Sequence, residues 1–157
     1  MENKKQVAII GAGVSGLLAC KYCLSKGFKP MVFDFESDIG GVWSKSMKTT
    51  RLQVPHGLYH FSDFPWPDEV DVYPTQQQML DYLHSYANKF DLMQHIRLNS
   101  KVKGISYDGP SSEAWELWNG TGETFPLDGK WNVSVDDTRN ATTQVWIMNA
   151  RIEIMSC

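Results

Sequence analysis

The chain has 157 residues, of which 42% are hydrophobic and 21% charged, and its formal net charge is −3. This length suits one domain with a full core and is too short for two domains of ordinary size. The small negative charge without a Lys/Arg run argues against nucleic acid as the main partner, and three cysteines do not provide a disulfide framework.

The first predicted element is a buried strand at residues 7–10, which runs into a glycine-rich turn. Gly11, Gly13 and Gly16 follow the strand at the spacing of a dinucleotide-binding loop. In such a loop Gly11 allows a sharp turn, Gly13 leaves room for a pyrophosphate, and Gly16 lets the next helix pack closely on the strand. An apolar helix is predicted over residues 17–24, and we expect its N-terminal side to face the bound anion.

A second strand is predicted after this helix, which ends at Gly27. The strand covers residues 31–33 and ends at Asp34, close to the expected spacing for an acid that binds a ribose 2′-hydroxyl. Glu36 is the rival for this role, but it lies beyond the end of the strand. Strand, glycine loop, helix, strand and acid therefore follow the order of a βαβ dinucleotide-binding unit. The alternative is a glycine-rich turn in an unrelated α/β domain.

The N-terminal apolar run also has the outline of a secretory signal, because Lys4 and Lys5 precede it. Its glycines stand at motif spacing, however, and no small-residue cleavage site follows. The chain also has no run of about 18 apolar residues that could span a bilayer. We therefore expect a cytoplasmic protein without a membrane span. Cys20 and Cys23 have redox-pair spacing, but they lie near the end of the first helix, so we expect them to pack in the core.

Two adjacent glycines follow the ribose-binding acid. Gly40 and Gly41 precede Val42 and Trp43, and two interpretations are open. One is a backbone that approaches a ligand closely beside a flat tryptophan wall, and the other is an ordinary turn. Residues 59–67 then combine aromatic residues and prolines without periodicity, which predicts a structured loop. The histidines around this loop lack further ligands nearby, so no metal site is expected.

The clearest second helix opens at Thr75. Thr75 and Gln78 can form a capping box, and apolar residues then recur at three- and four-residue spacing as far as Phe90. The remaining strand candidates lie at residues 96–98, 101–107, 131–135 and 144–148. Apolar residues alternate strictly over residues 131–135, which predicts a half-exposed strand there. A polar, Gly- and Ser-rich insertion over residues 108–129 separates the strands and is expected to be mobile.

Taken together, these pieces resemble the N-terminal part of a flavin-containing monooxygenase of the plant branch. The glycine-rich loop is shared by many flavin and nicotinamide enzymes, whereas the Gly-Gly-x-Trp and Phe-Ser-Asp-Phe-Pro pieces are more specific. The resemblance covers most of the chain, about residues 5–135. It is carried by the segments 11–16, 33–34, 40–43, 52–55, 61–67, 80–87 and 90–92.

The resemblance implies an FAD site on the Rossmann-like start of the chain. Its cofactor-binding residues would be Gly11, Ala12, Gly13, Val14, Ser15, Gly16, Asp34, Gly40, Gly41, Val42, Trp43 and Val102. The glycine-rich loop would hold the pyrophosphate, and the backbone at Val102 would lie near the adenine. Asp34 stands where the family usually has Glu, and either carboxylate can accept a hydrogen bond from the ribose. Gln53 stands where several relatives carry an Asn near the flavin and the nicotinamide, and it is the one candidate for a catalytic role.

The resemblance also implies the reaction. In this family NADPH reduces the flavin, which reacts with O2 to give a flavin C4a-hydroperoxide that oxygenates a soft nitrogen or sulfur nucleophile. Because the cofactor carries this chemistry, no side-chain nucleophile or acid–base pair is needed. The implied partners are therefore FAD, NADPH, O2 and a small-molecule nucleophile.

The chain departs from the family pattern in its length and at its C-terminal end. Family members are several hundred residues long and carry a second glycine-rich motif for NADPH, which is not found here. We therefore expect residues 1–148 to form an incomplete α/β, Rossmann-like FAD-binding domain with a βαβ start and an antiparallel strand insertion. Residues 149–157 lack the small-residue-Thr-Gly turn of the family and are expected to form a divergent tail, with the NADPH-binding domain absent.

On this basis the fragment by itself is expected to lack full turnover. Two alternatives stay open. One is an NAD(P)-binding dehydrogenase-like module, which would need a proton-transfer residue set that we do not find. The other is a non-catalytic nucleotide-binding fragment.

Overall fold

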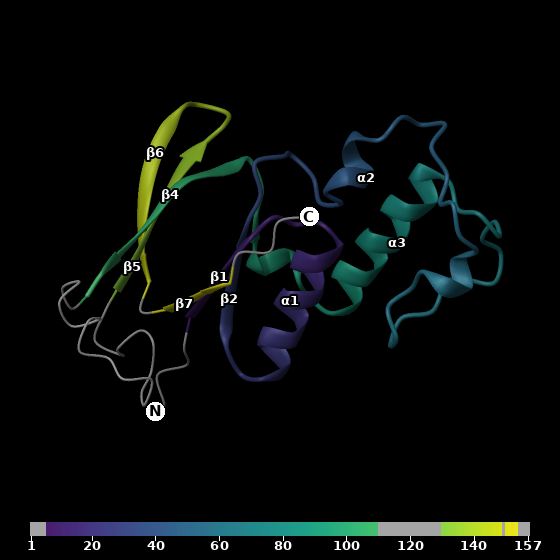
Figure 1. Cartoon of the computed structure of the whole chain (residues 1–157), viewed down its shortest axis with the longest axis horizontal. Helices are drawn as coiled ribbons and strands as arrows, with labels where there is room; N and C mark the ends of the chain where they lie inside the picture. Colours follow the sequence, from purple (N-terminus) through teal and green to yellow (C-terminus); the bar gives the residue numbers. More distant parts are fainter. Residues whose placement is uncertain (1–5, 110–129, 149, 154–157) are drawn as a thin grey trace, which may run out of the picture.

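In the part of the chain that the structure describes, residues 6–109, 130–148 and 150–153, four parallel strands form a central sheet in the order β3-β2-β1-β7 (Figure 1). The structure is a computed structural model. The strands of this sheet are β1 (Gln6–Ile10), β2 (Lys29–Phe33), β3 (Ile96–Arg97) and β7 (Ala150–Glu153). A second, antiparallel sheet consists of β4 (Ser100–Asp108), β5 (Lys130–Asp137) and β6 (Thr142–Met148). The helices are α1 (Val14–Ser25), α2 (Val42–Lys45) and α3 (Gln76–Lys89), and 3-10 turns cover His56–Leu58 and Met93–His95.

The parallel sheet is covered on both faces. On one face, Ile9 of β1 belongs to a buried cluster with Leu17 of α1 and Leu83 of α3. On the other face, Ala8 packs with Val133 of the antiparallel sheet. Successive side chains of a strand point to opposite faces, so a strand buried on both sides needs a continuous apolar run, as predicted for residues 7–10. The antiparallel sheet, the parallel sheet and the helices α1 and α3 follow one another as layers in Figure 1.

The β1–α1–β2 unit has the parallel pairing of a dinucleotide-binding fold. β1 pairs with β2 along its length, from Gln6 opposite Lys29 to Ile10 opposite Phe33. The predicted α/β fold, with a βαβ start and an antiparallel sheet inserted after it, is therefore confirmed. β7 pairs in parallel with the other edge of β1. The prediction of a divergent tail without a strand over residues 149–157 is therefore wrong for residues 150–153, which form β7.

The predicted strands are all present and differ from the predictions mainly at their ends. β3 ends at Arg97, and β4, β5 and β6 each extend beyond the predicted ranges. The short helix α2 and the two 3-10 turns were not predicted. Of the polar insertion expected to be mobile, residues 110–129 lie outside the described part of the chain. No helix within the described ranges is long and apolar enough to cross a membrane.

Helix α1 begins at Val14, inside the glycine motif, and ends before Gly27, whose φ is +77°. Leu17 and Cys20 are fully buried on its inner side. Tyr22 also belongs to the predicted apolar helix, but it is 47% exposed, because the buried stripe covers only one side of the helix. Burial raises the pKa of the Cys20 thiol to about 12. This thiol therefore stays protonated at neutral pH, which disfavours redox chemistry.

Helix α3 opens with the predicted capping box. The Gln78 N–H donates to Thr75 Oγ1 at 3.2 Å, and the Thr75 N–H donates to Gln78 Oε1 at 2.9 Å. These two bonds satisfy N–H groups that the helix itself leaves without acceptors. Of the predicted apolar face, Phe90 is half-buried and the other members are buried, namely Met79, Leu83, Tyr86 and Ala87. Tyr82, which was not predicted for this face, is buried with them.

An aromatic cluster joins α3 to the loop at residues 59–67. The ring of Phe61 stacks on Tyr86 at 3.8 Å and on Tyr82 at 5.8 Å between centroids. The Tyr82 hydroxyl accepts from the Phe61 N–H at 2.8 Å and donates to the Phe64 carbonyl at 2.5 Å. The Tyr86 hydroxyl, in contrast, is buried without a hydrogen-bond partner among the described residues. The two tyrosines therefore differ in what their hydroxyl groups contribute to stability.

Tyr86→Phe is expected to change the free energy of unfolding by less than about 0.5 kcal/mol, or to raise it, because the lost hydroxyl makes no bond. Tyr82→Phe is expected to lower it by about 1–2 kcal/mol, because the buried Phe61 N–H loses its acceptor. Urea denaturation of both variants measures the difference. They are matched controls, since the same atom is removed from the same helix. A loss for Tyr86→Phe as large as that for Tyr82→Phe would contradict the prediction.

Candidate functional site

A cavity of about 450 Å³ opens where the carboxyl ends of β1 and β2 meet the N-terminal side of α1. Ligands of parallel α/β sheets bind at this edge, and the volume lies in the range of cofactor sites. The lining comes from the strand ends, the two glycine segments, one loop residue and the start of β4. Its residues are Ile10, Gly11, Gly13, Val14, Ser15, Gly16, Phe33, Asp34, Phe35, Gly40, Gly41, Val42, Trp43, Tyr59, Ser100, Lys101 and Val102.

The first glycine segment takes the chain from β1 into α1. Gly11 has φ of +101°, a conformation that L side chains rarely adopt, and its N–H donates to the Phe33 carbonyl at 2.8 Å. Gly16 lies so close to this turn that a Cβ on it would stand 1.9 Å from the Gly11 carbonyl oxygen. The backbone thus accounts for glycine at both positions. The role of Gly13 toward a pyrophosphate stays a prediction.

The N-terminus of α1 faces the cavity without a side-chain cap. Gly13 is the N-cap residue and supplies no side-chain hydrogen bond, and no acidic side chain lies in the first turn. The first N–H groups of an α-helix have no acceptors within the helix, and the helix dipole places partial positive charge there. In a cavity of cofactor size, this arrangement suits a phosphate or diphosphate group.

The second glycine segment packs against the first. Gly40 donates its N–H to the Ala12 carbonyl at 3.0 Å. Gly41 has φ of +56°, and a Cβ on it would stand 3.0 Å from the Gly13 Cα. Two interpretations of this pair were left open by the sequence. The structure shows a close backbone approach between the two glycine segments, and both segments line the same cavity.

Asp34 connects the end of β2 to the glycine loop. The residue is 5% exposed, and its Oδ2 accepts from the Ala12 N–H at 2.6 Å. Oδ1 accepts from the Glu36 N–H at 2.9 Å. A carboxylate has about four acceptor sites, so two bonds leave capacity for a ligand hydroxyl. Asp34 lines the cavity, whereas its rival Glu36 does not and instead forms an ion pair with Lys45 at 2.7 Å.

The backbone on either side of Phe35 is fixed to the connection between β3 and β4. The Ser100 N–H donates to the Asp34 carbonyl at 2.7 Å, and the Asn99 N–H donates to the Glu36 carbonyl at 2.7 Å. This brings the start of β4 to the end of β2. Main-chain hydrogen bonds therefore hold the part of the cavity wall that the end of β2 and the start of β4 form.

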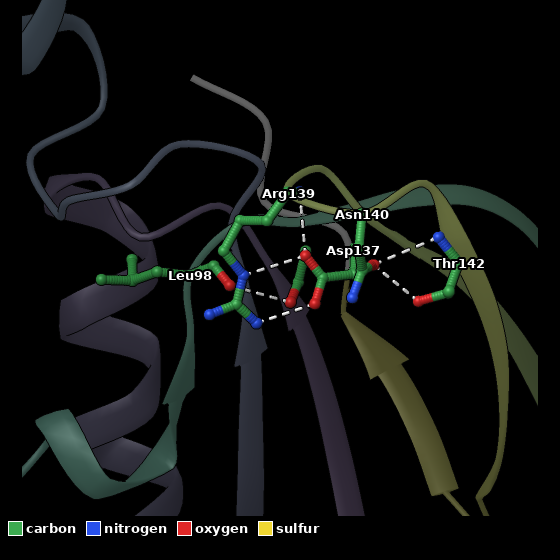
Figure 2. A network of polar contacts seen from close by, with 6 residues as sticks. Leu98, Asp137, Arg139, Asn140 and Thr142 are labelled. Atoms are coloured by element: carbon green, nitrogen blue, oxygen red, sulfur yellow. Dashed lines mark hydrogen bonds and ion pairs between the residues drawn. The ribbon is translucent and has the colours of Figure 1, made fainter.

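The turn between β5 and β6 supports this connection, and Figure 2 shows the polar contacts within the turn itself. The Thr138 N–H donates to the Asn99 carbonyl at 2.9 Å. Within the turn, the Arg139 guanidinium donates to both carboxylate oxygens of Asp137, at 3.0 and 2.7 Å. Hydrogen bonds from the Arg139 side chain and then its backbone lower the pKa of Asp137 to about 2. The turn therefore keeps this ion pair across the neutral pH range.

The backbone of Trp43 is held by a buried glutamine that no sequence motif predicts. Gln76 is 7% exposed, and its Nε2 donates to the Trp43 carbonyl at 2.8 Å. Its own N–H donates to the Thr50 carbonyl at 2.9 Å. Its spacing in the sequence could have identified it as buried. Gln76 stands three residues before Met79 and seven before Leu83, and so it shares their apolar face of the helix. A polar side chain on such a face needs a partner.

Asp34 and Lys101 are the charged residues in the cavity lining. Lys101 stands opposite Asp136 in the β4–β5 register. Asp136, however, accepts from Thr143 Oγ1 at 2.6 Å and lies 3.8 Å from the Lys103 ammonium. Among the described residues, Lys101 is thus the one positively charged residue in the cavity lining, on the side formed by β4.

Two of the residues predicted for the site lie outside the lining. Ala12 is fully buried, and its N–H is bound to Asp34. Gln53 is exposed, and its catalytic role stays a prediction. Phe35, Tyr59, Ser100 and Lys101 line the cavity without having been predicted. Within the described ranges, no three His, Cys, Asp or Glu side chains gather as a metal site.

Comparison with known protein families and sequences gives concordant matches. A family model described as "Flavin-binding monooxygenase-like" matches residues 4–152. The protein named "Probable flavin-containing monooxygenase 1" from Arabidopsis thaliana is 42% identical over 138 residues, which are 85% of this chain and 26% of the relative. The chain thus spans about a quarter of the length of that relative.

Solved structures share the fold. The S-allyl-L-cysteine S-oxygenase of Allium sativum aligns with a TM-score of 0.74 at 20% identity, over 96% of this chain and 36% of that one. A structure titled "Oxidized steroid monooxygenase bound to NADP" aligns with a TM-score of 0.66 at 26% identity, over 88% of this chain and 24% of that one.

Proposed function

Because the chain belongs to the flavin-binding monooxygenase-like family, we propose that its cavity binds FAD as part of an NADPH-dependent flavin-containing monooxygenase. The observation that carries the proposal is a single cavity lined by both the uncapped N-terminus of α1 and the buried carboxylate of Asp34. A dinucleotide needs both features, one for its diphosphate and one for a ribose.

The donor set fits FAD. The glycine loop and the first turn of α1 would hold the diphosphate, and Asp34 would accept from ribose hydroxyl groups. Trp43 would contribute a flat apolar wall, and its backbone is fixed by Gln76. Lys101 would add positive charge beside an anionic ligand. These residues bind and orient the cofactor and keep water from it.

When bound, FAD supplies the redox and oxygen-activating chemistry by which such an enzyme oxygenates a soft nitrogen or sulfur nucleophile. We propose NADPH as the reductant and O2 as the co-substrate. The similarity to a steroid monooxygenase bound to NADP supports the choice of reductant.

Titration of the purified chain with FAD tests the proposal. The wild-type chain is expected to retain flavin absorbance through gel filtration and to release it on denaturation. Gly13→Ala is expected to raise the Kd for FAD at least about tenfold, because a methyl group at the loop obstructs the pyrophosphate. On the protein side this methyl group meets the Gly41 Cα at 3.4 Å, an ordinary contact, so the fold should persist.

Gly57→Ala is the matched control. A Cβ at Gly57 meets no atom within 4 Å, its φ is not positive, and it does not line the cavity, so the Kd for FAD should be unchanged. Folded protein that binds NADH but no FAD would favour a dehydrogenase-like module instead. An unchanged Kd in Gly13→Ala would show that the glycine loop does not hold the cofactor.

A further inference from the structure

We propose that Phe35 is the platform on which the adenine ring of the cofactor stacks, and that Lys45 and Glu36 hold its ring in position. The inference rests on the proposed function, because it assumes that a dinucleotide binds in the cavity. It concerns Phe35, which belongs neither to the glycine motif nor to the ribose-binding position and so has no role in the proposal above.

Phe35 stands at the adenosine end of the cavity. It directly follows Asp34, the carboxylate assigned to the ribose, and both residues line the cavity. Ser100, Lys101 and Val102 line it too, and the Ser100 N–H bonds to the Asp34 carbonyl. The base of a nucleotide is attached to its ribose, so a base whose ribose lies at Asp34 meets the end of β2 and the start of β4.

The ring of Phe35 has one face occupied by a cation. The Lys45 ammonium lies 4.0 Å from the ring centroid, and the same ammonium pairs with Glu36 Oε1 at 2.7 Å. Lys45 belongs to α2, so this contact joins α2 to the end of β2. Base–aromatic stacking needs only one face of a ring, and we assign the adenine to the face opposite Lys45.

The backbone of Phe35 is immobilised although its side chain is half exposed. Both neighbouring carbonyls accept hydrogen bonds from the β3–β4 connection, and the Glu36 N–H is bound by the Asp34 carboxylate. The residue nevertheless remains 50% exposed. A large aromatic residue that is half exposed, lines a cavity and has hydrogen-bonded main chain on both sides is suited to stacking on a ligand base.

Three variants of Phe35 test the proposal with FAD, ADP and FMN as ligands, each titrated calorimetrically. Phe35→Ala is expected to raise the Kd for FAD and for ADP about tenfold, the effect expected for one lost stacked base. Phe35→Leu keeps apolar bulk without a ring and should show most of this loss, whereas Phe35→Trp should stay within about threefold of wild type. FMN lacks the adenosine part, so its Kd should not change.

Tyr73→Ala is the matched control, since Tyr73 is 48% exposed and does not line the cavity. Thermal unfolding of each variant checks that the fold is kept. Unchanged affinity for FAD and ADP in Phe35→Ala, full affinity in Phe35→Leu, or an equal loss for FMN would each overturn the proposal. If the wild-type chain binds ADP but no flavin, the proposed function fails, and the ADP titrations still decide the role of Phe35.

Discussion

Gly16→Ala is expected to lower the free energy of unfolding by about 3 kcal/mol or more, and to weaken FAD binding at the same time. The added Cβ would stand 1.9 Å from the Gly11 carbonyl oxygen and 2.9 Å from its carbon, so backbone must move. No flexible side chain can give way, because the atoms that it meets belong to the turn between β1 and α1. The shift would displace the helix N-terminus from the cavity. Urea denaturation and FAD titration measure the two effects.

Gly104→Ala provides the control at a strand glycine with open space around the added Cβ. Gly104 lies in β4, has no positive φ, and a Cβ on it meets nothing within 4 Å. We expect its stability to stay within about 0.5 kcal/mol of wild type or to rise slightly, since alanine restricts the unfolded chain. Equal stability of Gly16→Ala and Gly104→Ala would contradict the close approach of Gly16 to the turn.

Asp34→Ala is expected to lower the free energy of unfolding by about 2–4 kcal/mol and to abolish measurable FAD retention. The carboxylate accepts from the N–H groups of Ala12 and Glu36, and each would be left without its acceptor. The Ala12 N–H has no access to water as a substitute, because this residue is fully buried. Loss of the carboxylate also removes the group assigned to the ribose.

Two further substitutions separate these contributions. Asp34→Asn keeps one carbonyl acceptor, so its loss of stability should be smaller than that of Asp34→Ala. Asp68→Ala removes an exposed carboxylate outside the cavity lining and should change neither stability nor FAD affinity. If Asp34→Ala unfolds at the same urea concentration as wild type, the Asp34 carboxylate does not hold the glycine loop.

Local sequence patterns were sufficient for the elements whose causes are local. The capping box of Thr75 and Gln78 and the apolar spacing after it define α3, and both depend on residues within a few positions of one another. The glycine spacing and the position of Asp34 likewise define the βαβ start, because strand, turn and helix follow directly in the chain. Helix α2 is shorter than the window over which periodicity can be recognised.

Contacts between distant segments were not predictable from such patterns. The bond from Ala12 to Asp34 and the contact of Gly13 with Gly41 join parts of the chain that a local pattern treats separately. The sequence left the purpose of the second glycine pair open for this reason. The place of Phe35 in the cavity wall also depends on the β3–β4 connection, which approaches only after the sheet has formed. The residue type of Phe35 alone does not indicate which distant segments approach it in the folded chain.

The contact between the two glycine segments also bears on gene recombination. Each segment is short and has its own sequence signature, which suggests that it could be replaced independently by the matching segment of a relative. Their backbones, however, approach one another at Gly13 and Gly41 and are joined by the bond from Gly40 to Ala12. A crossover between the two segments would combine glycine segments from different parents, whose backbones were not selected to pack against one another. Shuffled genes in this family should therefore survive most often when both segments come from the same parent.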